Sequence, residues 1–207
     1  TKTLPDGEPQ RLTTDGHNQA PRWSPSGEWL AFRKKHQVWI MRADGSDARP
    51  LNEGLTVGAF AWSPNTDGLA YIDSTGFELW TVSPADAAPV RLVSTSTHGS
   101  GQVNRVAWSP DGTWIAYEWI EGVSDGSLPP PRNLWKVAVH GEERVELFRG
   151  GSREIGGPLL VGWTGSGRLV LVQDDMGSAS LLADGAPLYA LSADTGALVR
   201  LADAVLA

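Results

Sequence analysis

The sequence of 207 residues contains no cysteine and only 17 Lys and Arg against 24 Asp and Glu. Without cysteine, a disulfide framework, a thiolate nucleophile and a Cys-ligated metal site are all excluded. The net charge of −7 disfavours nucleic acid as the main partner, because a phosphate backbone is bound by clustered Lys and Arg. No apolar run approaches the roughly 20 residues that cross a bilayer, and the chain begins Thr-Lys-Thr-Leu-Pro with no apolar signal core.

Tryptophan, in contrast, is abundant, and the ten Trp residues reveal an internal repeat. In each of four copies, a Trp is followed nine residues later by an aromatic or aliphatic residue. These pairs are Trp23 and Phe32, Trp62 and Tyr71, Trp108 and Tyr117, and Trp163 and Val172. A second aromatic residue then precedes a Leu by twelve residues. Those pairs are Trp39 and Leu51, Trp80 and Leu92, Trp135 and Leu147, and Tyr189 and Leu201.

Each block of fixed length predicts a β-hairpin. Ser109-Pro110-Asp111-Gly112 has the residues of a type I turn, and its flanks are short and rich in aromatic and aliphatic residues. Each repeat then holds four antiparallel strands, A to D in chain order. Pro50 and Pro89 lie in D strands, so D should be a sheet edge, where a missing N–H is tolerated. Four-stranded units at a period of roughly 40–50 residues predict an all-β fold, the β-propeller.

We expect four complete blades, preceded by the outer strand of an earlier one. The expected boundaries are 1-16 for the end of that preceding blade, 17-55 for blade 1, 56-98 for blade 2, 99-153 for blade 3 and 154-207 for blade 4. Both ends have the pattern of a D strand, which favours a segment of a larger ring. Two alternatives stay open: a closed ring of four blades with residues 1–13 as a strap, and two chains that close one eight-bladed ring.

The segments Trp-Ser-Pro-Asp-Gly-Thr-Trp-Ile-Ala-Tyr at 108–117 and Val-Trp-Ile-Met-Arg-Ala-Asp-Gly-Ser-Asp-Ala-Arg-Pro-Leu at 38–51 resemble the TolB-like (WD-like) β-propeller repeat family. The resemblance covers nearly the whole chain. Copy two departs from the pattern at Asn65-Thr66, and copy four departs at Gly165 and Val172. The resemblance implies a six-bladed ring, and two kinds of role are known for such repeats. One is an exported, non-catalytic hub of the bacterial cell envelope or periplasm. The other is the gating propeller of prolyl oligopeptidase-like serine peptidases.

No motif in the chain supports catalysis or a cofactor. Residues 122–126 match the G-x-S-x-G nucleophile elbow, but the prolines at 129–131 exclude the helix that must follow the serine. The four His, at 17, 36, 98 and 140, lack metal-ligand spacing, and we expect them in loops. Asp pairs at 44 and 47 and at 174 and 175 have the pattern of turns more than of a cation site. The basic run 33–36 is expected to be a solvated hairpin tip.

The insertions are more informative. In an A-to-D blade the B–C turn and the D-to-A connection lie on the same rim. The two segments whose length varies between copies are these two connections, so the insertions fall on that rim. Residues 119–133, 173–186, 94–104 and 149–158 should crowd this rim over blades 3 and 4, where we expect partner contact. The candidate contact residues are Trp119, Leu128, Arg132, Arg153, Glu154, Asp174, Asp175 and Met176. Alternatively, these loops pack only on their neighbours.

The sequence therefore predicts a non-enzymatic scaffold that binds a protein or peptide through this rim, outside the cytoplasm by resemblance alone. It predicts no cofactor, no metal and no nucleic-acid partner. The alternative is the substrate-gating propeller of a serine peptidase whose catalytic domain lies outside this chain. A lectin-like propeller and a small-molecule site at the channel mouth also stay open, although packing accounts for most of the Trp residues.

Overall fold

The computed structural model describes residues 11–35, 37–51, 57–73, 75–85, 88–122, 130–141, 143–150, 158–173 and 187–202. These residues form four antiparallel sheets of four strands each, and within every sheet the strands pair in chain order. This confirms the prediction of an all-β chain made of four-stranded units. We number the sheets as blades 1 to 4.

Sixteen strands and one short helix make up the described part of the chain. Blade 1 comprises β1 (Asn18–Trp23), β2 (Trp29–Lys34), β3 (Gln37–Arg42) and β4 (Arg49–Pro50). Blade 2 comprises β5 (Val57–Trp62), β6 (Leu69–Asp73), β7 (Leu79–Val82) and β8 (Val90–Val93), and is followed by α1 (Thr95–His98). Blade 3 comprises β9 (Gly101–Trp108), β10 (Trp114–Glu121), β11 (Arg132–Ala138) and β12 (Arg144–Phe148). Blade 4 comprises β13 (Pro158–Trp163), β14 (Arg168–Gln173), β15 (Leu188–Ser192) and β16 (Leu198–Ala202).

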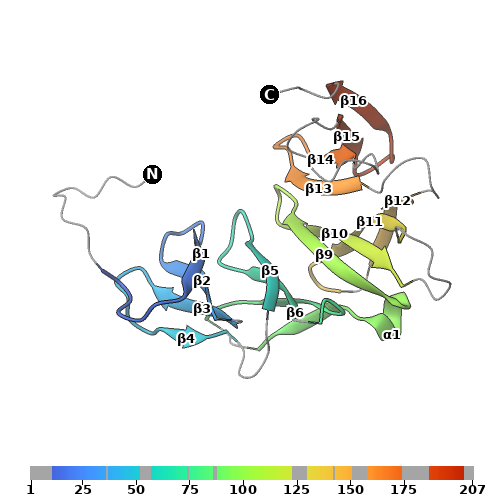
Figure 1. Cartoon of the computed structure of the whole chain (residues 1–207). Helices are drawn as coiled ribbons and strands as arrows, with labels where there is room; N and C mark the ends of the chain where they lie inside the picture. Colours follow the sequence, from blue (N-terminus) through green and yellow to red (C-terminus); the bar gives the residue numbers. More distant parts are fainter. Residues whose placement is uncertain are drawn as a thin grey trace.

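The blades follow one another along an open arc (Figure 1). The first strands of neighbouring blades touch, β5 against β9 and β9 against β13. The fourth strand of each blade is a sheet edge, as predicted. Pro50 lies in β4, whereas Pro89 immediately precedes β8. Both prolines are therefore at positions where a missing N–H breaks no ladder between two central strands.

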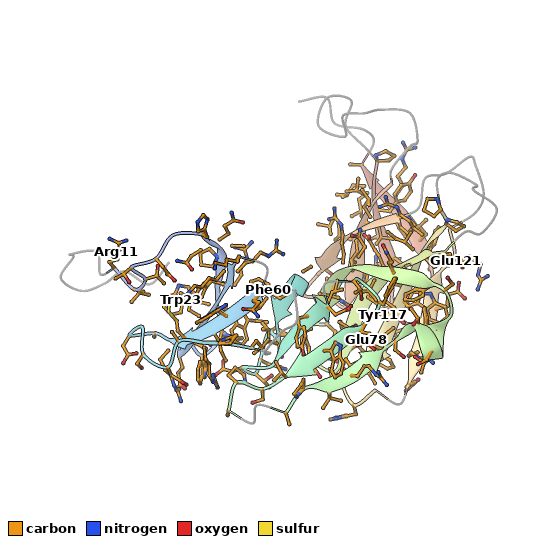
Figure 2. All side chains as sticks on the ribbon, turned by 60° about the horizontal axis from the view of Figure 1, so that its bottom comes forward. Arg11, Trp23, Phe60, Glu78, Tyr117 and Glu121 are labelled. Carbon is orange, nitrogen blue, oxygen red and sulfur yellow. The ribbon has the colours of Figure 1, made fainter. Side chains whose placement is uncertain are left out.

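The Trp residues that end the first strands join each blade to the one before it. The indole N–H groups of Trp62, Trp108 and Trp163 donate to the backbone carbonyls of the preceding blade. The acceptors are Arg22 at 2.9 Å, Ala61 at 3.0 Å and Ala107 at 3.0 Å. This repeated bond confirms that these Trp residues pack between blades. Trp23, the equivalent residue of blade 1, is 53% exposed (Figure 2).

The core consists of side chains packed between adjacent blades. Tyr71 packs between blades 1 and 2, and Tyr117 between blades 2 and 3, and both are fully buried. Between blades 3 and 4 lies a buried carboxylate, Glu118, which accepts hydrogen bonds from the Leu160 backbone N–H and, at 2.9 Å, from the Asn104 side chain. Burial raises the pKa of Glu118 above its usual value.

The A–B turns of copies three and four keep one geometry although their sequences differ. In copy three, the Gly112 N–H donates to the Ser109 carbonyl at 2.9 Å, and Gly112 has a φ of 71°. In copy four, Gly167 donates to Thr164 at 3.1 Å with a φ of 77°, although Gly165 replaces the proline. The glycine that follows the turn must adopt a left-handed conformation, and it is the residue these two copies share.

The B–C insertion of blade 3, expected over residues 119–133, is partly strand. β10 ends at Glu121, where the sequence places a strand end, and β11 begins at Arg132. Trp119 pairs with Asn133 across these strands. The added residues extend the hairpin, so part of the insertion is sheet and only the remainder is loop.

Candidate functional site

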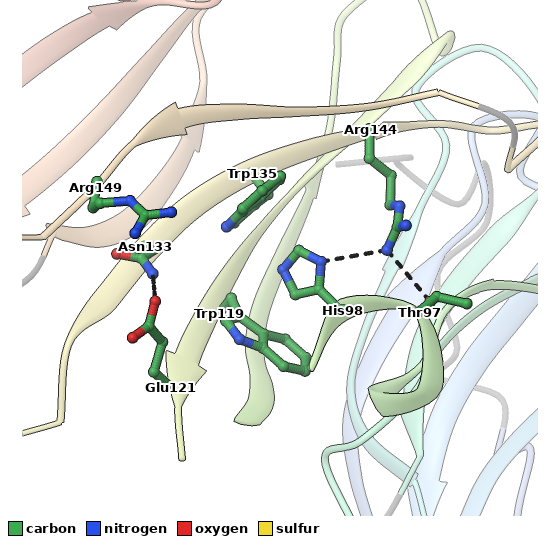
Figure 3. A pocket seen from close by; sticks show the side chains of 8 residues that line it. All are labelled: Thr97, His98, Trp119, Glu121, Asn133, Trp135, Arg144 and Arg149. Carbon is green, nitrogen blue, oxygen red and sulfur yellow. Dashed lines mark hydrogen bonds between the residues drawn. The ribbon is translucent and has the colours of Figure 1, made fainter. Parts of the chain in front are cut away.

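A pocket of about 530 Å³ lies on blade 3 beside α1 (Figure 3). Its walls come from α1, which connects blades 2 and 3, and from strands β10, β11 and β12 of blade 3. Arg149, which directly follows β12, completes the lining. The lining residues are Thr97, His98, Trp119, Glu121, Asn133, Trp135, Arg144 and Arg149. The ends of β10 and β12 and the start of β11 lie on the same rim as the connection that contains α1.

His98 ends the single turn of α1 and reaches into the aromatic part of this pocket. The helix follows Ser94, whose carbonyl accepts the backbone N–H groups of Thr97 at 3.1 Å and His98 at 3.0 Å. The imidazole lies edge-on to Trp119 at 4.3 Å and to Trp135 at 4.4 Å, measured between ring centroids. The ring is thus enclosed by aromatic side chains, whereas we had expected His98 to be an ordinary loop residue.

Arg144 determines which nitrogen of His98 carries the proton. Its guanidinium lies 3.3 Å from the His98 Nδ1 and donates to the Thr97 hydroxyl at 3.3 Å. Because a guanidinium can only donate, Nδ1 accepts and the ring proton is on Nε2. Burial, together with the charge of Arg144, lowers the pKa of His98 to about 4. His98 is therefore a neutral hydrogen-bond donor at pH 7.

Three buried polar atoms around this imidazole have no hydrogen-bond partner among the described residues. They are the Nε2 of His98, the Nε1 of Trp135 and the hydroxyl of Tyr117. Tyr117 is the cross-strand partner of Trp135, and its ring centroid is 5.7 Å from that of His98. Leaving a buried donor unpaired costs roughly 1–3 kcal/mol, so three such atoms in one cluster need an explanation.

The polar end of the pocket is internally bonded. The Asn133 side chain donates to Glu121 at 2.6 Å and accepts the Gly150 backbone N–H at 3.0 Å. Arg149 makes two hydrogen bonds to Glu146, at 2.7 and 3.0 Å. These hydrogen bonds form a polar wall, and Figure 3 shows the unpaired nitrogens of His98 and Trp135 facing the space beside it.

The structure describes two of the eight candidate contact residues. Trp119 is only 3% exposed and lines the pocket from within β10 instead of projecting from a loop. Arg132 is the first residue of β11. The remaining candidates, Leu128, Arg153, Glu154, Asp174, Asp175 and Met176, lie outside the described residues, as does the serine of the elbow-like segment.

The sequence does not mark His98, Trp135 and Arg144 as site residues. The repeat indicates only a packing role for Trp135, and His98 and Arg144 are 46 residues apart in the sequence with no shared motif. One signal was available, because His98 lies in a D-to-A insertion on the rim that was expected to carry function.

Other features of the described residues are less specific. A second pocket of about 280 Å³ lies on the opposite rim, between the A–B turns of blades 3 and 4. The described part of the chain holds no group of three or more His, Cys, Asp or Glu that could bind a metal ion. None of its helices has the length and apolar character needed to span a membrane.

The blades and their interblade bonds define the class of this chain as a β-propeller. No protein-family model matches it. Two curated relatives, an uncharacterized protein of Agrobacterium fabrum and the uncharacterized protein YidR of Escherichia coli, are each 28% identical to it. The matches cover 55% and 57% of this chain but only 44% and 32% of the relatives, so less than half the length of each relative is matched.

Solved structures match over most of the chain. A putative TolB from Agrobacterium tumefaciens aligns with a TM-score of 0.56 at 17% identity, over 88% of this chain and 79% of that one. The acylaminoacyl peptidase of Pyrococcus horikoshii aligns with a TM-score of 0.67 at 11% identity, over 91% and 32%. The β-propeller domain of the Trilobed protease of Pyrococcus furiosus gives 0.62 at 13% identity, over 91% and 58%. The chain is thus structurally similar to TolB-like and peptidase β-propeller domains.

Proposed function

We propose that this chain is a non-catalytic scaffold that binds a protein or peptide through the rim formed by the B–C turns and D-to-A connections. The observation that carries the proposal is the pocket on blade 3, because most of its lining residues come from α1 and from strand ends on this rim, and two of its buried donors have no partner among the described residues. Binding surfaces are commonly built from connections held by a rigid sheet scaffold. The 28% identity to uncharacterized relatives adds no more specific role.

The scaffold proposal includes a larger ring, six-bladed by resemblance to TolB-like repeats, and a location outside the cytoplasm. The first and last blades both present apolar side chains to solvent. Trp23 in blade 1 is 53% exposed, and in blade 4 Val161 is 59% exposed and Leu201 51% exposed. At the interfaces between neighbouring blades, the residues equivalent to Trp23 (Trp62, Trp108 and Trp163) and to Leu201 (Leu51, Leu92 and Leu147) are packed in the core. This supports further blades as the cover for Trp23 and Leu201.

Site-specific photo-crosslinking tests the scaffold proposal. A benzophenone amino acid is placed at Arg132 or Arg149 on the proposed binding rim, and at Asp111 or Asp194 on the opposite rim as matched controls. After irradiation of the cells that make the protein, we expect adducts of discrete mass from the first pair only. Adducts confined to the opposite rim, or no adduct from either rim, would contradict the proposal.

The second candidate is the substrate-gating propeller of a serine peptidase. The TM-score of 0.67 to the acylaminoacyl peptidase, of which this chain covers 32%, favours it. The mass of the native polypeptide, detected with an antibody against this chain, distinguishes the two candidates. A polypeptide larger by a whole catalytic domain would favour the peptidase, and one larger by only a blade or two would favour the scaffold.

A further inference from the structure

We propose that the pocket on blade 3 binds a carboxylate group carried by a partner peptide. This inference rests on the proposed function and adds the chemistry that the partner must present. The ligand group would lie against the Nε2 of His98 and the Nε1 of Trp135, within reach of the guanidinium of Arg144.

The polarity of the free atoms selects a hydrogen-bond acceptor. Trp135 Nε1 is a donor only, and His98 Nε2 is a donor because Nδ1 faces Arg144 at 3.3 Å. Both nitrogens are buried, lack a partner among the described residues and belong to lining residues of the same pocket. A group that offers two acceptor oxygens satisfies both donors at once. A ligand that only donates satisfies neither.

The charge of the pocket selects a monoanion. Two arginines line it, but Arg149 is neutralised by two hydrogen bonds to Glu146. The ion pairs among the described residues leave Arg144 without a carboxylate partner, and its hydrogen bonds run to the neutral Thr97 and His98. Glu121 adds a negative charge at the far wall. One uncompensated guanidinium beside a negative wall suits a carboxylate better than a doubly charged phosphate.

In blade 2, a carboxylate of the chain itself accepts the N–H of the equivalent indole. Trp80 is the equivalent of Trp135, and its indole N–H donates to Glu78 at 3.1 Å. In blade 3 the residue equivalent to Glu78 is Asn133, whose side chain is bonded to Glu121 and Gly150 instead. Among the described residues of blade 3, no carboxylate takes the place that Glu78 has beside the indole of blade 2. A partner can supply it in blade 3, where α1 adds the second donor.

The test follows the indole N–H resonances of the protein in ¹H–¹⁵N spectra, with Trp135 and Trp80 assigned from Trp135→Phe and Trp80→Phe. The probes are benzoate, its neutral analogue benzamide and its doubly charged analogue phenylphosphonate. We expect benzoate to move the Trp135 indole proton downfield and leave Trp80 in place, because Trp80 is already bonded to Glu78 whereas the Trp135 donor has no partner among the described residues. No movement of Trp135, or movement as large with benzamide or tighter with phenylphosphonate, would overturn the carboxylate assignment.

Matched variants separate binding from folding. Arg144→Met should weaken benzoate binding about tenfold, since hydrogen bonds to a charged group are the stronger ones. Arg91→Met, which removes an arginine on the outer strand of blade 2, should leave binding unchanged. If Arg144→Met unfolds the protein, Thr97→Val and Trp135→Phe provide the comparison. Equal benzoate affinity in all folded pocket variants would overturn the proposal.

Peptide probes then identify the source of the carboxylate. They are Gly-Gly-Gly-Gly-Phe as a free acid, the same peptide as an amide, and an N-acetylated, amidated pentapeptide with a central Glu. Movement of Trp135 with either acidic peptide and not with the amide supports a peptide carboxylate. Movement with benzoate alone overturns the peptide source and points to a free small carboxylate. Peptide binding that moves other resonances but not Trp135 leaves the scaffold proposal standing and overturns this inference.

Discussion

Blades 2 and 3 have the same arrangement of four strands but differ in the hydrogen bonding of the indole in their third strand. In blade 2, Glu78 accepts the indole N–H of Trp80 and pairs with Arg91 at 3.0 Å, so the group is closed. In blade 3 the residues at the positions of Glu78 and Arg91 are Asn133 and Glu146. Two residue differences at equivalent positions thus leave the indole of blade 3 without the partner that it has in blade 2, within the same four-stranded plan.

Truncation of Glu78 in blade 2 and of its equivalent Asn133 in blade 3 should give the largest difference in stability between the two blades. Asn133 is 1% exposed, and Asn133→Ala would leave Glu121 and the Gly150 N–H without their partner. We expect it to lower the free energy of unfolding by about 2 kcal/mol. Glu78→Ala, at a more solvated carboxylate, should cost about 1 kcal/mol. Urea denaturation measures both, and an equal cost would contradict the idea that Asn133 holds the wall of the pocket.

Replacement of each indole by a phenyl ring tests whether the two N–H groups differ. Trp80→Phe removes a donor that is satisfied, whereas Trp135→Phe removes a buried donor that is not. The loss of apolar area is similar, so Trp80→Phe should be the more destabilising by about 1 kcal/mol. Thermal unfolding of the two variants in the same buffer provides the measurement. A larger loss for Trp135→Phe would mean that its indole has a partner.

The titration of His98 should give the stability of blade 3 a pH dependence of its own, because blade 2 has no histidine at the equivalent place among its described residues. The pKa of His98 is about 4 in the folded protein and 6.5 for the free side chain. The unfolded chain therefore takes up the proton first, and this contribution to stability is lost as the pH falls from about 6.5 to about 4. Arg144 lowers this pKa and Glu146 opposes the shift.

The pH effect is measured as the free energy of unfolding across that range. His98→Gln should show a shallower decline than the wild type, and Glu118, whose pKa is raised by burial, contributes with the opposite sign in both proteins. Nitrogen chemical shifts of the His98 ring give an independent check, since they report the neutral form with the proton on Nε2. A ring that is charged at pH 6 would contradict the assignment.

The smallest effect is expected from the exposed arginine of the closed group. Arg91 is 51% exposed and pairs with Glu78 on the surface of blade 2. Arg91→Met should change the stability by no more than about 0.5 kcal/mol, because solvent screens such pairs. A cost above 1 kcal/mol in thermal unfolding would show that the closed group depends on Arg91 as well as on Glu78.

Repeat spacing predicted the blades because it reflects packing that recurs in every copy. The Trp residues at 62, 108 and 163 make the same bond to the preceding blade, so a fixed spacing in the sequence reports a fixed contact in the structure. The pocket could not be predicted in this way. It depends on Asn133 differing from Glu78, and on His98 and Arg144 meeting from separate elements. Neither the difference nor the meeting leaves a periodic signal.

A crystal structure of the protein with benzoate would show whether the blade 3 pocket accepts a carboxylate while the equivalent group of blade 2 does not. We expect one carboxylate oxygen within hydrogen-bond distance of Trp135 Nε1 and the other near His98 Nε2, with Glu78 still bonded to Trp80. Benzoate bound elsewhere, or a His98 Nε2 bonded to a group of the protein itself, would rule out this binding mode.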